Sequence, residues 1–82
     1  MNENMSRAGR GALGWSRNDL AREANLSAVV VVKFEGGGNV RQGTLDAIIE
    51  AFAANGVTFS KQGKVRYMKY DERKAAKRVE GE

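Results

Sequence analysis

The chain has 82 residues and a hydrophobic content of 41%, which is enough for one small domain with a single core. It contains no cysteine and no histidine, so disulfides, Cys/His zinc sites and thiol or imidazole catalysts are excluded. The net charge of +4 is spread along the chain, and such a mild excess permits binding to nucleic acid without requiring it.

No apolar run approaches the roughly 20 residues of a membrane-spanning helix, and the first residues lack the apolar core of a signal peptide. We therefore expect a cytoplasmic protein with no cofactor, no metal and no membrane partner. We do not expect an enzyme, because no pair of carboxylates is spaced for acid/base catalysis.

The N-terminal segment is expected to form a frayed start and a weak helix. Residues 1–4 should be frayed, and a first helix over residues 5–13 has an apolar stripe at helical spacing, formed by Met5, Ala8, Ala12 and Leu13. Gly14 is suited to end this helix, and Trp15 follows as an expected core anchor. Arg7 and Arg10 are expected to be solvated, although either could reach a phosphate.

Two short helices joined by a tight turn are predicted next. Ser16 and Ser27 are the expected N-caps of helices over residues 17–24 and 28–35. Asn25 lies where the chain must reverse, and Asn is among the residues that best tolerate a left-handed backbone. Two helices connected in this way form a helix-turn-helix.

Four consecutive valines, residues 29–32, dominate the second of these helices. A 3.6-residue repeat gives it an inner face formed by Leu26, Val30, Val31 and Phe34. It gives an outer face formed by Ala28, Val29, Val32 and Lys33. β-branched residues favour strands, so the local preference competes with the helix. The outer valines could contact DNA, form a protein-binding patch or simply belong to the core.

The remaining sequence predicts one strong helix and a hairpin. Asn39 is the expected cap of a helix whose core-facing residues are Leu45, Ile48, Ile49 and Phe52. Residues 57–59 and 64–68 alternate like two strands around a hairpin loop. Residues 69–82 are dense in charge and nearly devoid of large apolar groups.

We divide the chain into three parts on this basis. Residues 1–6 are expected to be a flexible arm, and residues 7–68 a helix-turn-helix domain with a C-terminal hairpin. Residues 69–82 are expected to be a charged, disordered tail.

A family resemblance covers about residues 7–67. It is carried by Leu13-Gly14-Trp15-Ser16, Asp19-Leu20-Ala21, Ala24-Asn25-Leu26-Ser27, Val31, Phe34-Glu35, Thr44-Leu45 and Asn55-Gly56-Val57-Thr58-Phe59. In this order the residues resemble the short single-domain Xre-type (lambda-repressor/Cro-like) regulators. The resemblance implies a mainly α domain of four to five helices with a small C-terminal β-hairpin. It also implies a sequence-specific DNA-binding transcriptional regulator, most simply a repressor, that acts as a homodimer on double-stranded operator DNA and is nucleoid-associated when bound.

The resemblance further implies which residues would touch DNA. Ser16 and Arg17, at the start of the second helix, would contact a phosphate or a base edge, and Ser27 would meet the phosphate backbone. Base-reading positions would be occupied by Ala28, Val29, Val32 and Lys33. Arg41 matches a region that often touches phosphate.

The outer face differs from the family pattern, which has polar or basic residues at positions 28, 29 and 32. Alanine and valine cannot form hydrogen bonds with bases and can contact only thymine methyl groups. The sequence therefore also predicts an alternative, a degenerate helix-turn-helix protein that binds another regulatory protein through this face as an antiactivator or antirepressor.

Overall fold

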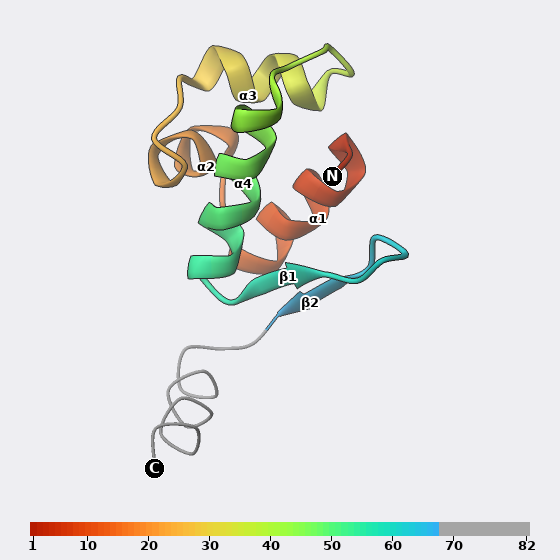
Figure 1. Cartoon of the computed structure of the whole chain (residues 1–82). Coiled ribbons are helices and arrows are strands. Elements are labelled where there is room, and N and C mark those ends of the chain that lie inside the picture. The colour runs from red at the N-terminus through yellow and green to blue at the C-terminus, as the bar shows by residue number, and fades with distance from the viewer. Residues whose placement is uncertain (68–82) are drawn as a thin grey trace.

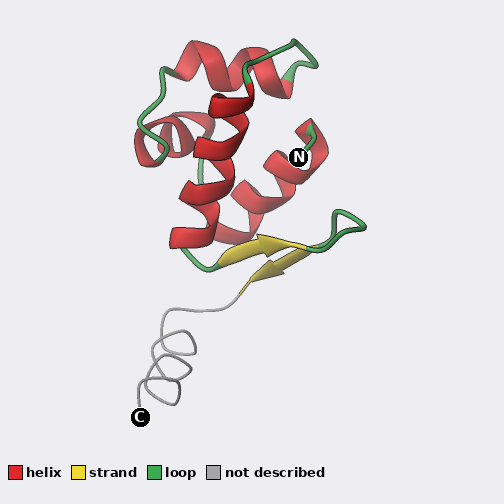
Figure 2. Cartoon of the chain, viewed as in Figure 1, coloured by secondary structure: helices red, strands yellow, loops and turns green. Residues whose placement is uncertain are grey.

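The computed structural model describes residues 1–67, which form four helices followed by a two-stranded hairpin (Figures 1 and 2). The helices are α1 (Glu3–Leu13), α2 (Arg17–Glu23), α3 (Ala28–Glu35) and α4 (Gln42–Ala54). The strands are β1 (Val57–Phe59) and β2 (Val65–Tyr67), which pair antiparallel. The predicted mainly α fold with a C-terminal hairpin is therefore confirmed. The predictions for Met68 and for the tail over residues 69–82 lie outside the described residues.

The helix α3 and the hairpin lie at opposite ends of the described chain. Figure 1 shows α3 crossing the top, α4 running down the centre and the hairpin closing the bottom beneath α1 and α4. The helix α3 packs on α2 and α1, and the hairpin packs on α1 and α4. One side of α3 is consequently left facing outward.

Each of α2, α3, α4 and β1 contributes at least one large apolar side chain to the core. Its fully buried members are Leu20, Val31, Ile48, Phe52 and Val57. Phe52 is the centre of an aromatic cluster: the Trp15 ring stacks on it with centroids 5.8 Å apart, and the Phe59 ring meets it edge-on at 5.7 Å. Trp15 thus packs against the core, as predicted.

The helix α1 begins earlier and buries a different face than predicted. The Asn2 side chain accepts a hydrogen bond of 2.9 Å from the Met5 backbone N–H, and this cap starts the helix at Glu3. The predicted flexible arm over residues 1–6 is therefore wrong, since its last four residues are the first turn of α1. The buried residues of α1 are Ser6 and Gly9, whereas Ala8, assigned to the apolar stripe, is exposed.

A close contact explains why Gly9 is buried. A Cβ atom at this position would lie 2.9 Å from the Phe52 ring, so only a residue without a side chain allows α1 to approach the core this closely. An apolar-periodicity argument overlooks such a residue because glycine is not counted as hydrophobic.

The start of α4 also corrects the sequence prediction. The N-cap residue is Arg41, not Asn39, and no side chain forms a cap hydrogen bond. Val40 and Leu45, which flank the first turn at the two positions of a hydrophobic staple, both pack on the core. The first turn of α4 is thus flanked by apolar packing in place of a side-chain cap. Ile49, predicted to face the core, is 39% exposed.

The valine-rich segment is a helix in spite of its β-branched residues. Ser27 Oγ caps it by accepting a hydrogen bond of 3.3 Å from the Val30 N–H. Val31 is fully buried and Phe34 is 6% exposed, which confirms these two inner-face residues. Burial of the inner face thus outweighs the local preference for a strand.

Candidate nucleic-acid interface

The turn between α2 and α3 is fixed by capping and by one left-handed residue. Ser16 and Asp19 form a reciprocal capping box: the Asp19 N–H donates to Ser16 Oγ at 3.0 Å, and the Ser16 N–H donates to the Asp19 carboxylate at 2.9 Å. Asn25 has φ 57°, as expected for the residue that reverses the chain. The Leu26 N–H then donates to the Ala21 carbonyl at 2.8 Å. These contacts hold α3 across α2 in a helix-turn-helix.

The two capping serines remain available to a ligand. Ser16 and Ser27 are both exposed, and each Oγ accepts a hydrogen bond from a backbone N–H. A hydroxyl group that accepts one bond still has its proton to donate. The cap therefore does not prevent either serine from donating to a phosphate oxygen.

The outer face of α3 is apolar at its start and basic at its end. Val29 is 77% exposed, Val32 is 47% exposed and Lys33 is also exposed. Their i, i+3, i+4 spacing aligns them in one stripe. Ala28 does not belong to it, because its side chain is half-buried and packs on the core. The prediction that Ala28 lies on the outer face is corrected in this respect.

Three cations from α2, α3 and the start of α4 have no partner among residues 1–67. Arg17, Lys33 and Arg41 are exposed, and no hydrogen bond or ion pair engages their side chains within the described chain. Arg22, by contrast, forms an ion pair with Asp19 at 2.8 Å. The unpaired cations come from the start of α2, the end of α3 and the start of α4.

Two of these cations share a shallow hollow between α3 and α4. Lys33 and Arg41 both line it, and its volume is about 420 Å³. Its other lining residues are Val30, Asn39, Val40 and Thr44. The structure thus brings Lys33 and Arg41 together, while Ser16 and Arg17 lie apart from this hollow, at the start of α2.

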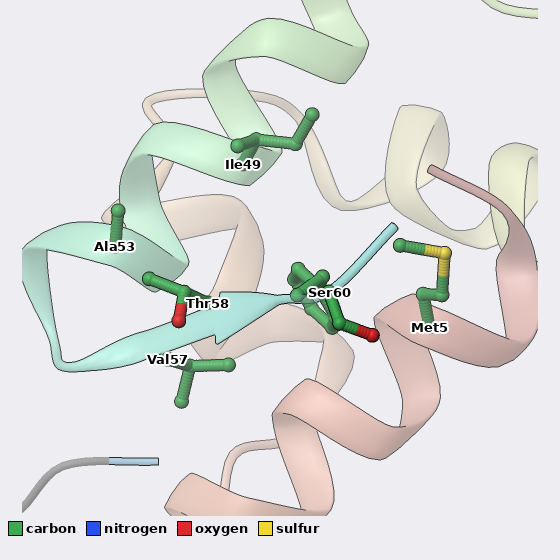
Figure 3. Close-up of a pocket in the computed structure, with 7 residues that line it drawn as sticks. Met5, Ile49, Ala53, Val57, Thr58 and Ser60 are labelled. Carbon is green, nitrogen blue, oxygen red and sulfur yellow. The ribbon is translucent and has the colours of Figure 1, made fainter. Parts of the chain in front are cut away.

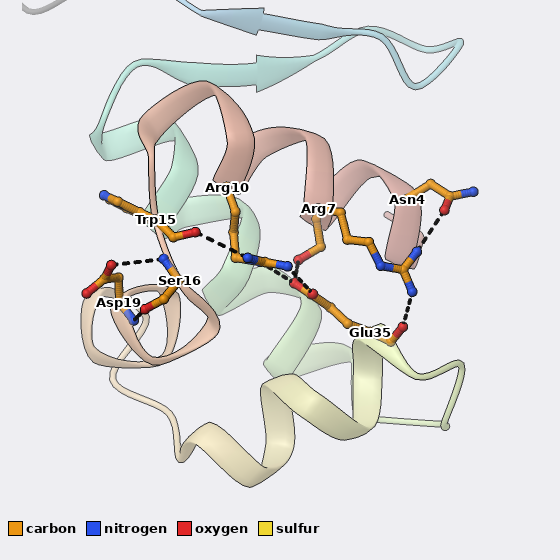
Figure 4. A network of polar contacts seen from close by, with 8 residues as sticks. Asn4, Arg7, Arg10, Trp15, Ser16, Asp19 and Glu35 are labelled. Atoms are coloured by element: carbon orange, nitrogen blue, oxygen red, sulfur yellow. Dashed lines mark hydrogen bonds and ion pairs between the residues drawn. The ribbon is translucent and has the colours of Figure 1, made fainter.

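A polar network on the inner side of α3 was not predicted. Glu35 is 3% exposed and Ser6 is fully buried, and the Ser6 hydroxyl donates to the Glu35 carboxylate at 2.6 Å (Figure 4). Arg10 donates to both oxygens of the same carboxylate, at 2.7 and 2.9 Å. Arg10 also donates to the Trp15 carbonyl at 3.2 Å, and Arg7 donates to the Glu35 carbonyl. The network therefore ties α1 to the end of α3 and to the segment that leads into α2.

The expectation that Arg10 is solvated is thus wrong, whereas Arg7 is exposed as expected and also donates to the Glu35 carbonyl. A signal was present in the sequence, because Ser6 and Arg10 are four residues apart and share one face of α1. A polar stripe on a helix is ordinarily interpreted as a solvated face. This stripe is directed inward because Glu35 lies opposite it and accepts its hydrogen bonds.

The carboxyl groups of Glu35 and Asp19 both have pKa values below their ordinary range. Burial raises the pKa of Glu35, but hydrogen bonds from Arg10 and Ser6, together with the charges of Arg10 and Arg7, outweigh burial and lower it. The exposed Asp19 has a lowered pKa chiefly because the Ser16 backbone N–H donates to it. Both groups are therefore charged at neutral pH.

A second hollow lies beside β1, at the opposite end of the described chain from α3 (Figure 3). Its volume is about 300 Å³. Its lining residues are mostly apolar and come from α1, α4 and the hairpin: Met5, Ile49, Ala53, Val57, Thr58, Phe59 and Ser60. The exposed Ile49 side chain belongs to this lining.

Among the described residues, no group of three or more metal-binding side chains is found, and none of the helices has the length and apolarity required to cross a bilayer. In the comparisons with known proteins, no protein-family model matches the chain, and no curated protein or solved structure is significantly similar to it.

Proposed function

We propose that this chain is a DNA-binding transcriptional regulator that inserts α3 into the major groove of an operator. The observation that supports this most directly is the outward face of α3, which carries the exposed and unpaired Lys33 in a hollow shared with the unpaired Arg41. A third exposed cation without a partner among the described residues, Arg17, lies at the start of α2. Unpaired cations on and beside a protruding helix suit a polyanion, because phosphate contacts supply most of the affinity for DNA. The resemblance to Xre-type regulators gives the same interpretation of the helix-turn-helix.

Each residue has a role in this proposal. Arg17 and Ser16 would bind a phosphate at the start of α2, and Ser27 would bind another at the start of α3. Val29 and Val32 would meet base edges, with Ala28 supporting them from its half-buried position. Lys33 and Arg41 would contact the backbone from their shared hollow.

The proposal includes a homodimer on a two-fold operator. The hairpin is the proposed contact region, since a two-stranded sheet leaves outer edges unpaired. The apolar hollow beside β1 and the exposed Ile49 support this choice, because a second copy would cover both. Half-sites would then lie about one helical turn of DNA apart. Sedimentation of the wild type and of an Ile49→Glu variant tests this part, and a dimer unaffected by the variant would locate the contact elsewhere.

The central experiment compares two arginines of the same helix. Arg17→Ala should weaken binding to duplex DNA and reduce the slope of log K against log salt by about 0.9, the value for one lost phosphate contact. Arg22→Ala is the matched control, because Arg22 is already paired with Asp19 and should leave the slope unchanged. Fluorescence anisotropy over a series of salt concentrations measures both. Equal effects of the two variants, or none, would contradict the site.

A second candidate function is supported by the exposure of Val29 and Val32. Two adjacent exposed valines on a small protein are a plausible contact for another regulatory protein. In that case Val32→Glu would abolish a protein complex, and NMR spectra would not change on addition of duplex DNA at low salt. Shifts at Arg17, Ser27 and Lys33 in the same titration would favour DNA binding.

A further inference from the structure

The outer face of α3 offers methyl groups and one ammonium group. Its exposed stripe consists of Val29, Val32 and Lys33. The only carboxylate of the helix, Glu35, is turned inward and is 3% exposed. No exposed side chain within α3 can therefore accept a hydrogen bond, and only Lys33 can donate one.

We infer that this face recognises operator DNA through the 5-methyl groups of thymine, an inference that rests on the proposed function. In the major groove, thymine alone among the four bases presents a methyl group. A valine side chain can bury that methyl group without losing a hydrogen bond. Each of the four bases presents at least one donor or acceptor that a valine cannot satisfy, and only thymine offsets this with a methyl group that the valine can bury.

The spacing of the two valines specifies where the methyl groups lie. Val29 and Val32 are three residues apart, which is a rise of about 4.5 Å along a helix with 1.5 Å per residue. Successive base pairs are separated by about 3.4 Å along one strand. Two valines at this spacing address neighbouring base pairs, so a half-site contains thymines at two adjacent positions.

The cations and the valines have separate roles in this inference. Lys33 is a compact and strongly hydrated cation, which suits a phosphate better than a bidentate base contact. Arg41 shares its hollow, and Arg17 is a further exposed cation at the start of α2. Two unpaired cations in one hollow beside the valine stripe suit a polyanion better than an apolar protein surface, where each buried charge would need a partner. The cations then supply sequence-independent affinity, and the valines supply the preference for thymine.

The test uses the full chain and a randomised duplex library that is enriched by binding and sequenced. In the most enriched duplex each thymine is replaced in turn by uracil, which lacks only the methyl group. Two adjacent uracils per half-site should each weaken binding about 3- to 5-fold, the factor for one buried methyl group, and the other replacements should be neutral. Val29→Ala and Val32→Ala should each remove the sensitivity at one of these positions, whereas Lys33→Ala should retain it.

The outcomes separate the inference from the function on which it rests. An enriched duplex that tolerates uracil at every thymine overturns the inference and leaves DNA binding in place. A library without any enriched sequence overturns it too, and duplex binding at low salt that Arg17→Ala weakens would then still support a DNA-binding protein. If the chain does not bind duplex DNA even at low salt, both the thymine inference and the proposed DNA-binding function are overturned. Because alanine favours helix more than valine does, a lost preference in the variants cannot be ascribed to unfolding of α3.

Discussion

Each side of α3 contains residues that depart from the usual distribution of polar and apolar groups. On the inner side, facing α1, the Glu35 carboxylate is 3% exposed and is bonded to Ser6 and Arg10. On the outer side, Val29 is 77% exposed. Charged groups are ordinarily outside and valines inside. The difference indicates that the inner side connects α3 to α1, whereas the exposed Val29 makes little contribution to the packing of the described chain.

A buried ion pair of this kind positions a helix more than it stabilises the fold. Removing two charges from water is unfavourable, and their attraction offsets this only if every lone pair and proton is satisfied. Here both Glu35 oxygens accept from Arg10, and Ser6 supplies a third bond. An apolar contact would allow α3 to rotate or slide against α1, while these directional bonds allow one arrangement.

The largest loss of stability is expected from removing the Glu35 carboxylate on the inner side of α3. Glu35→Ala would leave Arg10 and the buried Ser6 hydroxyl without their acceptor, and removing one partner of a buried pair lowers the unfolding free energy by about 3–5 kcal/mol. Urea unfolding followed by circular dichroism measures this. Arg22→Ala, which breaks the exposed pair with Asp19, is the control and should change it by less than about 1 kcal/mol. Similar values for both variants would contradict the burial of the Glu35 network.

A smaller change in stability is expected from substituting two glycines of α1, Gly9 on its buried side and Gly11 on its exposed side. Gly9→Ala would place a Cβ atom 2.9 Å from the Phe52 ring, and overpacking of this kind lowers stability by about 1–3 kcal/mol. Gly11→Ala meets no atom within 4 Å and should raise stability by about 0.5–1 kcal/mol through helix propensity. Opposite shifts in the urea midpoint are the expected result. Two shifts of the same sign would contradict the close approach of α1 to Phe52.

Acidification should weaken the hydrogen bonds and the ion pair of Glu35 before it affects the apolar contacts of the core. The pKa of Glu35 is lowered in the folded chain, so the unfolded chain binds a proton more readily as the pH falls below 4.5. The stability contributed by this carboxylate is present above pH 4.5 and is lost as the pH falls through its folded pKa. Glu35→Gln should remove this part of the pH dependence, while Asp19→Asn removes only the part from the exposed cap. Thermal unfolding at several pH values makes the comparison, and an unaltered profile for Glu35→Gln would contradict it.

How much of this could be predicted from the sequence depends on the kind of contact. Capping residues and turn residues act locally, so Ser16, Asn25 and Ser27 could be assigned from their neighbours alone. The Glu35 network could not, because its partners are 25 and 29 residues away in the sequence. The start of α4 was missed for a related reason, since apolar packing and not a side-chain hydrogen bond flanks its first turn.

The candidate interface shows the same limit. The outward direction of Val29, Val32 and Lys33 follows from helical periodicity, and the structure agrees. That Ala28 turns toward the core, and that Lys33 and Arg41 line one hollow, depends on how α3 crosses α2 and α4. Periodicity within one helix contains no information about that crossing.

The smallest effect is predicted for Val29, and Val31, which points in the opposite direction from α3, is its control. Val31 is fully buried, and Val31→Ala should lower the unfolding free energy by about 2 kcal/mol through lost burial and a cavity. Val29 is 77% exposed, and Val29→Ala should raise it by a few tenths of a kcal/mol, roughly the difference in helix propensity. Urea unfolding at low protein concentration is the measurement. A destabilising Val29→Ala would mean that the valine is covered in the free protein, by a second copy if the loss grows with concentration. A neutral or stabilising result would mean that the Val29 methyl groups do not contribute to folding, as their exposure in the described chain indicates.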